Sequence, residues 1–161
     1  MEPIAYRPIG IIHSPFEDSV GMPIQPVGAI GIRGRVVVFP EFVVGLKDLE
    51  EFSHIHLIYH FHLSRGFDLE VKPFLDSRKH GLFATRAPRR PNAIGLSVVR
   101  LTGIQGNLLS VEDVDILDGT PLLDIKPYAP AIDHREVDSA GWLGDKSGAA
   151  AVARADERFR S

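Results

Sequence analysis

Fifteen glycines and twelve prolines are spread over the 161 residues of this chain, and they constrain its fold more than any other feature. Both residue types weaken or break a helix from within, so long helices have little room. The segments between them are short and rich in β-branched and aromatic residues, which is typical of strands. We expect such strands over residues 5–13, 30–39, 54–63, 81–85, 96–104 and 108–117. The pattern predicts a mainly β protein, a small antiparallel β-barrel with short helices.

Local signals predict three further elements. Gln105-Gly106-Asn107 forms a hairpin turn between two of these strands. Residues 41–49 form a short helix, because their apolar side chains follow Pro40 at helical spacing. Residues 122–125 are a further short buried strand.

The length suits one folded domain, which we place over residues 1–133. Residues 134–161 are predicted to be a C-terminal extension. Within it, residues 147–160 are rich in alanine and carry charges at helical spacing, so we expect a peripheral helix or a partly ordered tail.

The chain contains no cysteine, which excludes disulfides, thiolate metal sites and cysteine nucleophiles. No apolar run approaches the ~20 residues that span a bilayer, and the first residues lack the pattern of a signal peptide. We therefore expect a cytoplasmic protein with no membrane partner.

The net charge of −3 argues against a generally basic protein that coats nucleic acid. The charge is uneven, however, because residues 65–100 carry eight basic and three acidic side chains. A local cluster of this kind can bind phosphates within an acidic protein. Charge counts alone favour the simpler alternative, a solvated surface with chance clustering.

Four histidines, His54, His56, His60 and His62, share the parity of one predicted strand and would point the same way. Two His-x-His pairs can bind zinc, nickel or iron, as in a metal-dependent hydrolase. The surrounding sequence offers no second cluster of ligands. We therefore favour a polar wall without metal and keep the hydrolase as the alternative.

Residues 81–97 combine a rigid, proline-containing turn with Arg86, Arg89 and Arg90. Proline restricts the loop and so reduces the entropy lost when the arginines are ordered on a ligand. The planar guanidinium group suits a carboxylate or a phosphate. A purely structural turn would seldom need three such groups, so this block predicts a binding function.

Residues 118–130 contain Asp-Gly followed by Thr-Pro, which predicts a tight turn that exposes backbone amides and a hydroxyl group. Such a turn can hydrogen-bond the edge of a purine or a ribose. Lys126 and Tyr128 project from the end of the strand that follows, and Tyr128 could stack on a base.

Together these blocks resemble the TrmO/YaeB (TsaA-like) family. The resemblance rests on two long motifs in the right order, with shorter matches before them, and covers residues 5–133. The matching runs are Ile9-Gly10-Ile11-Ile12-His13-Ser14-Pro15-Phe16, Pro23-Ile24-Gln25-Pro26, Phe52-Ser53-His54, Phe83-Ala84-Thr85-Arg86, Arg90-Pro91-Asn92-Ala93-Ile94-Gly95-Leu96-Ser97 and Asp118-Gly119-Thr120-Pro121-Leu122-Leu123-Asp124-Ile125-Lys126-Pro127-Tyr128.

The resemblance implies an S-adenosylmethionine-dependent methyltransferase that acts on tRNA. Its target would be the N6 amine of threonylcarbamoyl-adenosine at position 37, in the anticodon loop. It also implies a β-barrel in place of a Rossmann domain, and a homodimer with cofactor sites at the subunit interface. A non-enzymatic RNA-binding module is a further alternative.

Carried over by position, the resemblance implies one set of residues around the cofactor: Pro23, Ile24, Gln25, His62, Leu63, Arg86, Leu96, Asp118, Gly119, Thr120 and Pro121. Our own hypothesis gives Arg86 the cofactor carboxylate or a phosphate, and gives the tRNA a second set: Arg89, Arg90, Lys126 and Tyr128. The proton released on transfer would pass to Asp118, Asp124 or solvent. The chain departs from the family at Ile24, where a basic residue is common, and at His56 and His60, where apolar or aromatic residues are usual.

Overall fold

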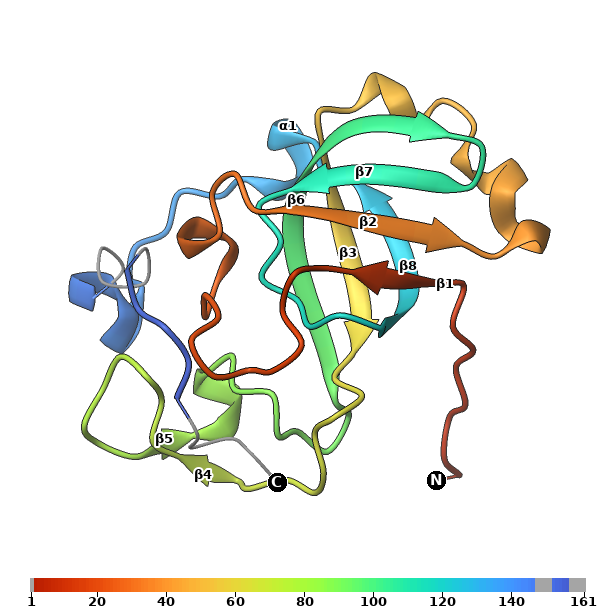
Figure 1. Cartoon of the computed structure of the whole chain (residues 1–161). Coiled ribbons are helices and arrows are strands. Elements are labelled where there is room, and N and C mark those ends of the chain that lie inside the picture. The colour runs from red at the N-terminus through yellow and green to blue at the C-terminus, as the bar shows by residue number, and fades with distance from the viewer. Residues whose placement is uncertain (1, 147–151, 157–161) are drawn as a thin grey trace.

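The computed structural model describes residues 2–146 and 152–156, and its centre is a closed antiparallel barrel of six strands (Figure 1). The strand order around the barrel is β1-β2-β7-β6-β3-β8. The bounds are Gly10–His13 for β1, Arg33–Val38 for β2, His54–His60 for β3, Ile94–Gln105 for β6, Leu108–Glu112 for β7 and Thr120–Pro127 for β8. The predicted fold class is confirmed.

Alternating side chains of each strand fill the barrel interior. In β3, Ile55, Leu57 and Tyr59 are at most 5% exposed. His54, His56 and His60 have the opposite parity and face outward as predicted, whereas His62 lies beyond the end of the strand. Burying one such apolar side chain contributes roughly 1.5–3 kcal/mol. The interior of this small barrel is therefore a packed core, and any ligand site must lie outside it.

Gly95 in β6 leaves room for the ring of Tyr59 on the neighbouring strand β3. It pairs with Tyr59 of β3, and a Cβ atom at this position would lie 2.2 Å from Tyr59 Cε2. The tyrosine ring therefore occupies the space that the Cβ atom of any residue other than glycine would need. This contact fixes the ring at the end of the barrel where the candidate site is found.

The predicted hairpin between β6 and β7 is confirmed: Gln105 pairs with Leu108, and Gly106 has the positive φ of 61° that such a turn requires. The strand predicted over 108–117 is too long. β7 ends at Glu112, because Asp113 adopts a φ of 68° and its carboxylate accepts a hydrogen bond of 2.7 Å from the amide of Gly31.

The strand predicted over 81–85 is wrong. Only His80–Gly81 (β5) is paired, with Glu70–Val71 (β4), in a small ribbon apart from the barrel (Figure 1). The chain then turns into the 3-10 helix η4, Leu82–Ala84. The Leu82 carbonyl accepts bonds from both the amide and the hydroxyl group of Thr85, so it is not available for a sheet.

The single helix predicted over 41–49 is also wrong in type. Two 3-10 helices occupy this segment, η2 (Pro40–Leu46) and η3 (Leu49–Glu51). Asp48 separates the two with a φ of 66°, which no helix continues through. A further 3-10 helix, η1 (Pro26–Gly28), precedes β2. The strands predicted over 5–13 and 30–39 are shorter in the structure, and that predicted over 122–125 is longer.

After β8 the chain forms α1 (Pro130–Asp133) and the 3-10 helix η5 (Gly141–Lys146). Of the helix predicted over 147–160, residues 147–151 and 157–160 lie outside the described residues. Residues 152–156 are not helical, and Arg154 pairs with Pro23 in an antiparallel bridge. The domain boundary at residue 133 stays a prediction. No helix in the described part of the chain is long and apolar enough to cross a membrane.

Candidate functional site

A cavity of about 1090 Å³ lies at one end of the barrel, where β3 ends and β6 and β8 begin. Its wall comes from five parts of the chain: residues 17–27, 59–65, 73–75, 85–96 and 115–120. Short segments of the C-terminal extension complete it. Small-molecule sites commonly measure about 300–1,000 Å³, so this cavity is large enough for a cofactor together with part of a second substrate.

Most of the residues predicted to surround a cofactor line this cavity. Eight of the eleven do so: Pro23, Ile24, Gln25, His62, Leu63, Arg86, Leu96 and Thr120. The other three, Asp118, Gly119 and Pro121, lie beside Thr120 in the chain but do not line it. The tight turn predicted here is present, since Gly119 has a φ of 73°.

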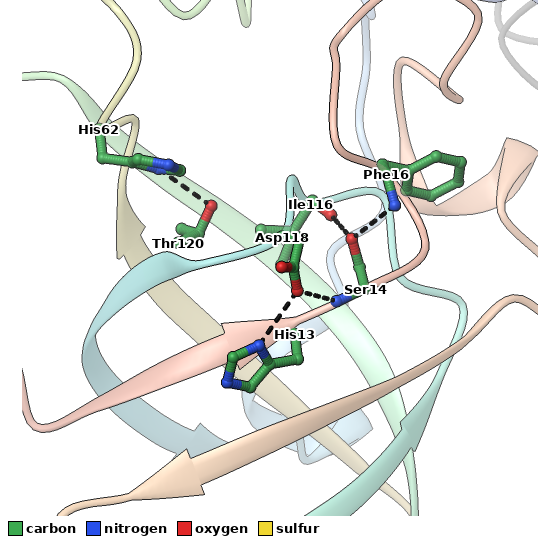
Figure 2. A network of polar contacts seen from close by, with 7 residues as sticks. All are labelled: His13, Ser14, Phe16, His62, Ile116, Asp118 and Thr120. Atoms are coloured by element: carbon green, nitrogen blue, oxygen red, sulfur yellow. Dashed lines mark hydrogen bonds and ion pairs between the residues drawn. The ribbon is translucent and has the colours of Figure 1, made fainter.

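His62 and Thr120 form one polar edge of the cavity (Figure 2). The Thr120 hydroxyl lies 3.3 Å from His62 Nδ1 and is almost fully buried. Burial lowers the pKa of His62, as does the neighbouring His60, while Asp118 opposes them in part. The imidazole is therefore neutral at physiological pH and able to share a hydrogen bond with the hydroxyl group.

Asp118 holds two chain segments together and faces away from this edge (Figure 2). Its Oδ1 accepts hydrogen bonds from the Ser14 amide at 3.0 Å and from the His13 ring at 3.1 Å, and the Ser14 hydroxyl donates to the Ile116 carbonyl. Burial acts to raise the pKa of Asp118, but the bonds from Ser14 and His13 outweigh it and leave the pKa below its ordinary value. This carboxylate is consequently a weak proton acceptor with a structural task.

Three arginines line the cavity, Arg65, Arg86 and Arg90, and none forms an ion pair with another described residue. Arg86 donates one bond of 3.0 Å to the Leu96 carbonyl. Arg90 donates to two backbone carbonyls and lies 5.8 Å from the centre of the Phe83 ring. Each guanidinium group has five N–H donors, so donors remain for an anionic ligand.

The other predicted substrate residues are not brought to the cavity. Arg89 pairs with Asp68 at 3.4 Å, and Lys126 pairs with Asp124 at 2.9 Å. Tyr128 follows the far end of β8, and a strand rises about 3.3 Å per residue, so roughly 25 Å of chain separates it from Thr120. The ring of Tyr128 lies near the rings of His54 and His56, with distances between ring centres of 6.4 and 5.5 Å.

The histidines of β3 have separate partners. His54 shares a hydrogen bond with Ser53, and His56 lies 3.3 Å from the Asp133 carboxylate. Among residues 2–146 and 152–156, no group of three or more histidine or acidic side chains is placed to hold a metal ion. Within the described residues, nothing thus favours the alternative of a metal-dependent hydrolase.

A buried network that the sequence did not predict lies in the cavity wall. The Ser97 hydroxyl donates a 2.7 Å bond to Asp115 and lies 3.0 Å from the Tyr59 hydroxyl. Burial raises the pKa of Asp115 to about 6, although the bonds from Ser97 and from its own amide and the charge of Arg86 act against it. Burial likewise raises the pKa of Tyr59 above its ordinary value. The one feature of the sequence that could have indicated this network is the placement of Asp115 between the apolar residues Val114 and Ile116.

The C-terminal extension also contributes residues that the sequence did not predict. Trp142 lines the cavity, donates a 2.8 Å bond to the Ala84 carbonyl and stacks on His80 with the ring centres 4.5 Å apart. Ala155 lines it as well and exchanges two backbone hydrogen bonds with Gly21 and Met22. The alanine-rich composition of the tail gave no sign of these contacts.

The cavity combines apolar walls with charges of both signs. Its charged lining comprises Glu17, Asp18, Arg65, Arg86, Arg90, Asp115 and Asp156. Such a surface suits a ligand that has both apolar and charged parts, and one carboxyl group in it, Asp115, has its pKa raised to about 6 by burial.

Comparison with known proteins gives this cavity a context. A family model described as the tRNA-methyltransferase O N-terminal domain matches residues 11–134. A Pyrococcus abyssi protein described as a probable S-adenosyl-L-methionine-binding protein is 60% identical over 158 residues, which are 98% of this chain and 86% of that protein.

Two further relatives are longer. The mouse protein named tRNA (adenine(37)-N6)-methyltransferase is 40% identical over 131 residues, 76% of this chain but 30% of its own length. The crystal structure of TrmO from Pseudomonas aeruginosa superposes with a TM-score of 0.73 at 39% identity, covering 88% of this chain and 63% of that one. This chain thus spans less than two thirds of either protein.

Proposed function

The chain belongs to the tRNA-methyltransferase O family, and from this premise we propose that it is an S-adenosylmethionine-dependent tRNA methyltransferase. We further propose that its target is the N6 amine of threonylcarbamoyl-adenosine at position 37. The observation that carries this proposal is the single cavity in which eight residues predicted to surround the cofactor come together.

The residues of the cavity fit the proposed cofactor. Leu63 and Leu96 are about half exposed and offer apolar surface to an adenine ring. Thr120 and His62 offer a hydroxyl group and a neutral imidazole to its polar edge or to the ribose. Arg86 has donors left for the methionine carboxylate. When bound, the sulfonium group supplies an activated methyl group, so the protein has mainly to align donor and acceptor and to exclude water.

The basic segment 65–100 supports a polyanionic substrate. Arg65 and Arg90 bring its charge into the cavity wall, where they can bind phosphates beside an unstacked base. Arg89, Lys126 and Tyr128 lie outside the cavity, and as tRNA contacts they would meet a more distant part of the molecule. The net charge of −3 is compatible with this, because binding uses the local patch.

We also propose a homodimer, with the cofactor sites near the interface, acting in the cytoplasm. Support for the dimer comes from two apolar side chains that line the cavity, are at least 40% exposed and are not assigned to the cofactor: Val27 and Ile94. A second copy of the chain would remove this surface from water. Analytical ultracentrifugation with and without cofactor measures the oligomeric state directly.

The decisive experiment measures transfer of a labelled methyl group from S-adenosylmethionine to tRNA that carries or lacks the threonylcarbamoyl group. We expect transfer only to the modified tRNA. Equal transfer to both would refute the proposed substrate, and tRNA binding without any transfer would instead indicate an RNA-binding module.

Cofactor binding is tested separately by calorimetry. Arg86→Ala should weaken binding about tenfold or more, because it removes a charge-assisted contact worth roughly 1.5–3 kcal/mol. Arg78→Ala is the matched control, since Arg78 is exposed and does not line the cavity. If both variants bound S-adenosylmethionine with the affinity of the wild type, Arg86 would have no role in cofactor binding.

A further inference from the structure

We propose that Asp115 accepts the proton released during methyl transfer, and that Ser97 positions its carboxylate for this task. The inference rests on the proposed function and assigns a residue that the two motifs of the family resemblance do not contain.

Side chains from two strands hold the carboxylate in place, one directly and one through the other. Ser97 in β6 donates a 2.7 Å bond to Asp115 Oδ1, and Tyr59 in β3 lies 3.0 Å from the same serine hydroxyl. Ser97 is 1% exposed, so water does not compete for its bonds. The chain of phenol, hydroxyl and carboxylate is therefore fixed before any ligand binds.

The backbone around Asp115 directs its side chain into the cavity. Val114 and Ile116, on either side of it, are 0% and 2% exposed and are anchored in the barrel core. Asp115 lies between them and lines the cavity, as does Tyr59. Neither Asp118 nor Asp124 lines it, so Asp115 is better placed than either carboxylate considered from the sequence alone.

The charges around Asp115 leave its carboxylate available. It forms no ion pair within the described residues, and Arg86 is the cation whose charge acts on it. Other titratable or charged groups share the cavity wall: Glu17, Asp18, Tyr59, His62, Arg65, Arg90 and Asp156. With burial raising its pKa to about 6, the group is ionised at neutral pH but more basic than an ordinary carboxylate.

The proposed reaction needs such a group. The acceptor nitrogen shares its lone pair with the purine ring and the carbamoyl carbonyl, so it attacks poorly while it keeps its proton. In the transfer an N–CH₃ bond forms as the S–CH₃ bond breaks, and that bonding pair stays on sulfur and neutralises the sulfonium. The N–H bonding pair remains on nitrogen and its proton passes to the Asp115 carboxylate, which balances atoms and charge.

The test compares single-turnover transfer rates over pH 5–8 in the full chain. The wild-type rate should rise with pH to a plateau with a midpoint near 6. Asp115→Asn should be slowed about 100-fold and lose this dependence. Ser97→Ala should shift the midpoint to higher pH, because the serine bond lowers the pKa of Asp115. Asp138→Asn, an exposed acid outside the cavity, is the control and should follow the wild type.

Two measurements that do not use activity complete the design. In ¹³C NMR, the Asp115 carboxyl carbon, assigned by its loss in Asp115→Asn, should titrate near 6, and a midpoint near 4 would overturn the proposal. Asp115→Asn should bind S-adenosylmethionine and S-adenosylhomocysteine with wild-type affinity. A selective loss of the methyl donor would instead make Asp115 a sulfonium-binding residue and overturn its role as proton acceptor.

The outcomes separate the inference from the function on which it rests. Transfer by the wild type, with an unchanged rate profile in Asp115→Asn, would refute the inference and leave the function standing. No transfer by the wild type would refute the proposed function and the inference with it. Should Asp115→Asn fold poorly, the shifted midpoint of Ser97→Ala supports the proposal, and an unshifted midpoint overturns it.

Discussion

Replacing Gly95 by alanine tests the contact that fixes the tyrosine at the floor of the cavity. An added Cβ would lie 2.2, 2.4 and 2.8 Å from three atoms of the Tyr59 ring, far inside contact distance, so the ring has to move. The ring is 5% exposed and belongs to the core cluster, so a shift toward the cavity would cost it core contacts. Overpacking of this kind costs about 1–3 kcal/mol, and breaking the Tyr59–Ser97 hydrogen bond adds about 0.5–1.5 kcal/mol. We expect Gly95→Ala to lower the free energy of unfolding by about 2–4 kcal/mol.

Urea denaturation measures this change, with Gly103→Ala as the matched control. Gly103 lies in the same strand, has a negative φ and has no atom within 4 Å of an added Cβ, so its substitution should be neutral or slightly stabilising. A double-mutant cycle identifies the cause. In the Tyr59→Leu background the ring is gone, and Gly95→Ala should then cost less than about 1 kcal/mol. The same cost in both backgrounds would refute the steric explanation.

Three further predictions follow from the site. Trp142 is the only tryptophan and lines the cavity, so S-adenosylmethionine should change the protein's tryptophan emission; an unchanged spectrum at saturation in calorimetry would contradict this placement. Asp118 has a lowered pKa, so its bonds to Ser14 and His13 stabilise the fold above about pH 4, and this contribution is lost as the pH falls through the lower folded value. Asp118→Asn should therefore be less stable than the wild type at pH 7, and this difference should shrink as the pH is lowered below about 4, as measured by urea denaturation. Asp115 has a raised pKa, so its ionisation should reduce stability as the pH rises from about 4 to 6, a slope that should vanish in Asp115→Asn. A wild-type curve without that slope would show that the carboxyl group titrates normally.

The sequence predicted the barrel because alternation and turn residues are local signals. The outward histidines of β3 and the hairpin at Gly106 followed from parity and from turn chemistry. The errors came where one residue overrides its segment. Asp113 and Asp48 adopt positive φ values that composition does not reveal, and Thr85 bonds back to Leu82 in a segment with a strand-like composition.

Contacts between segments that are distant in the chain could not be predicted from the sequence. Trp142 is held at the cavity by the hydrogen bond that its indole N–H donates to the Ala84 carbonyl, 58 residues earlier in the chain. Ala155 reaches it through backbone bonds to Gly21 and Met22, for which side-chain identity hardly matters. No periodicity or composition within 134–161 encodes either contact. The sequence therefore did not predict that Trp142, Leu143, Ala155 and Asp156 of the extension line the cavity.

The two aspartates near the site show why a motif locates a region better than it assigns a role. Asp118 belongs to a motif and is exposed, yet its carboxylate is occupied by the Ser14 amide and the His13 ring, which depress its pKa and fix the turn before Thr120. Asp115 belongs to no motif, but core residues hold it on both sides and burial raises its pKa. A proton acceptor has to be accessible to the ligand and more basic than water-exposed carboxylates, and only Asp115 meets both conditions. A turn, in contrast, needs an acceptor that stays ionised, which is the property that Asp118 has. The opposite shifts of two carboxylates three positions apart thus separate the residue that shapes the site from the residue that we propose works in it.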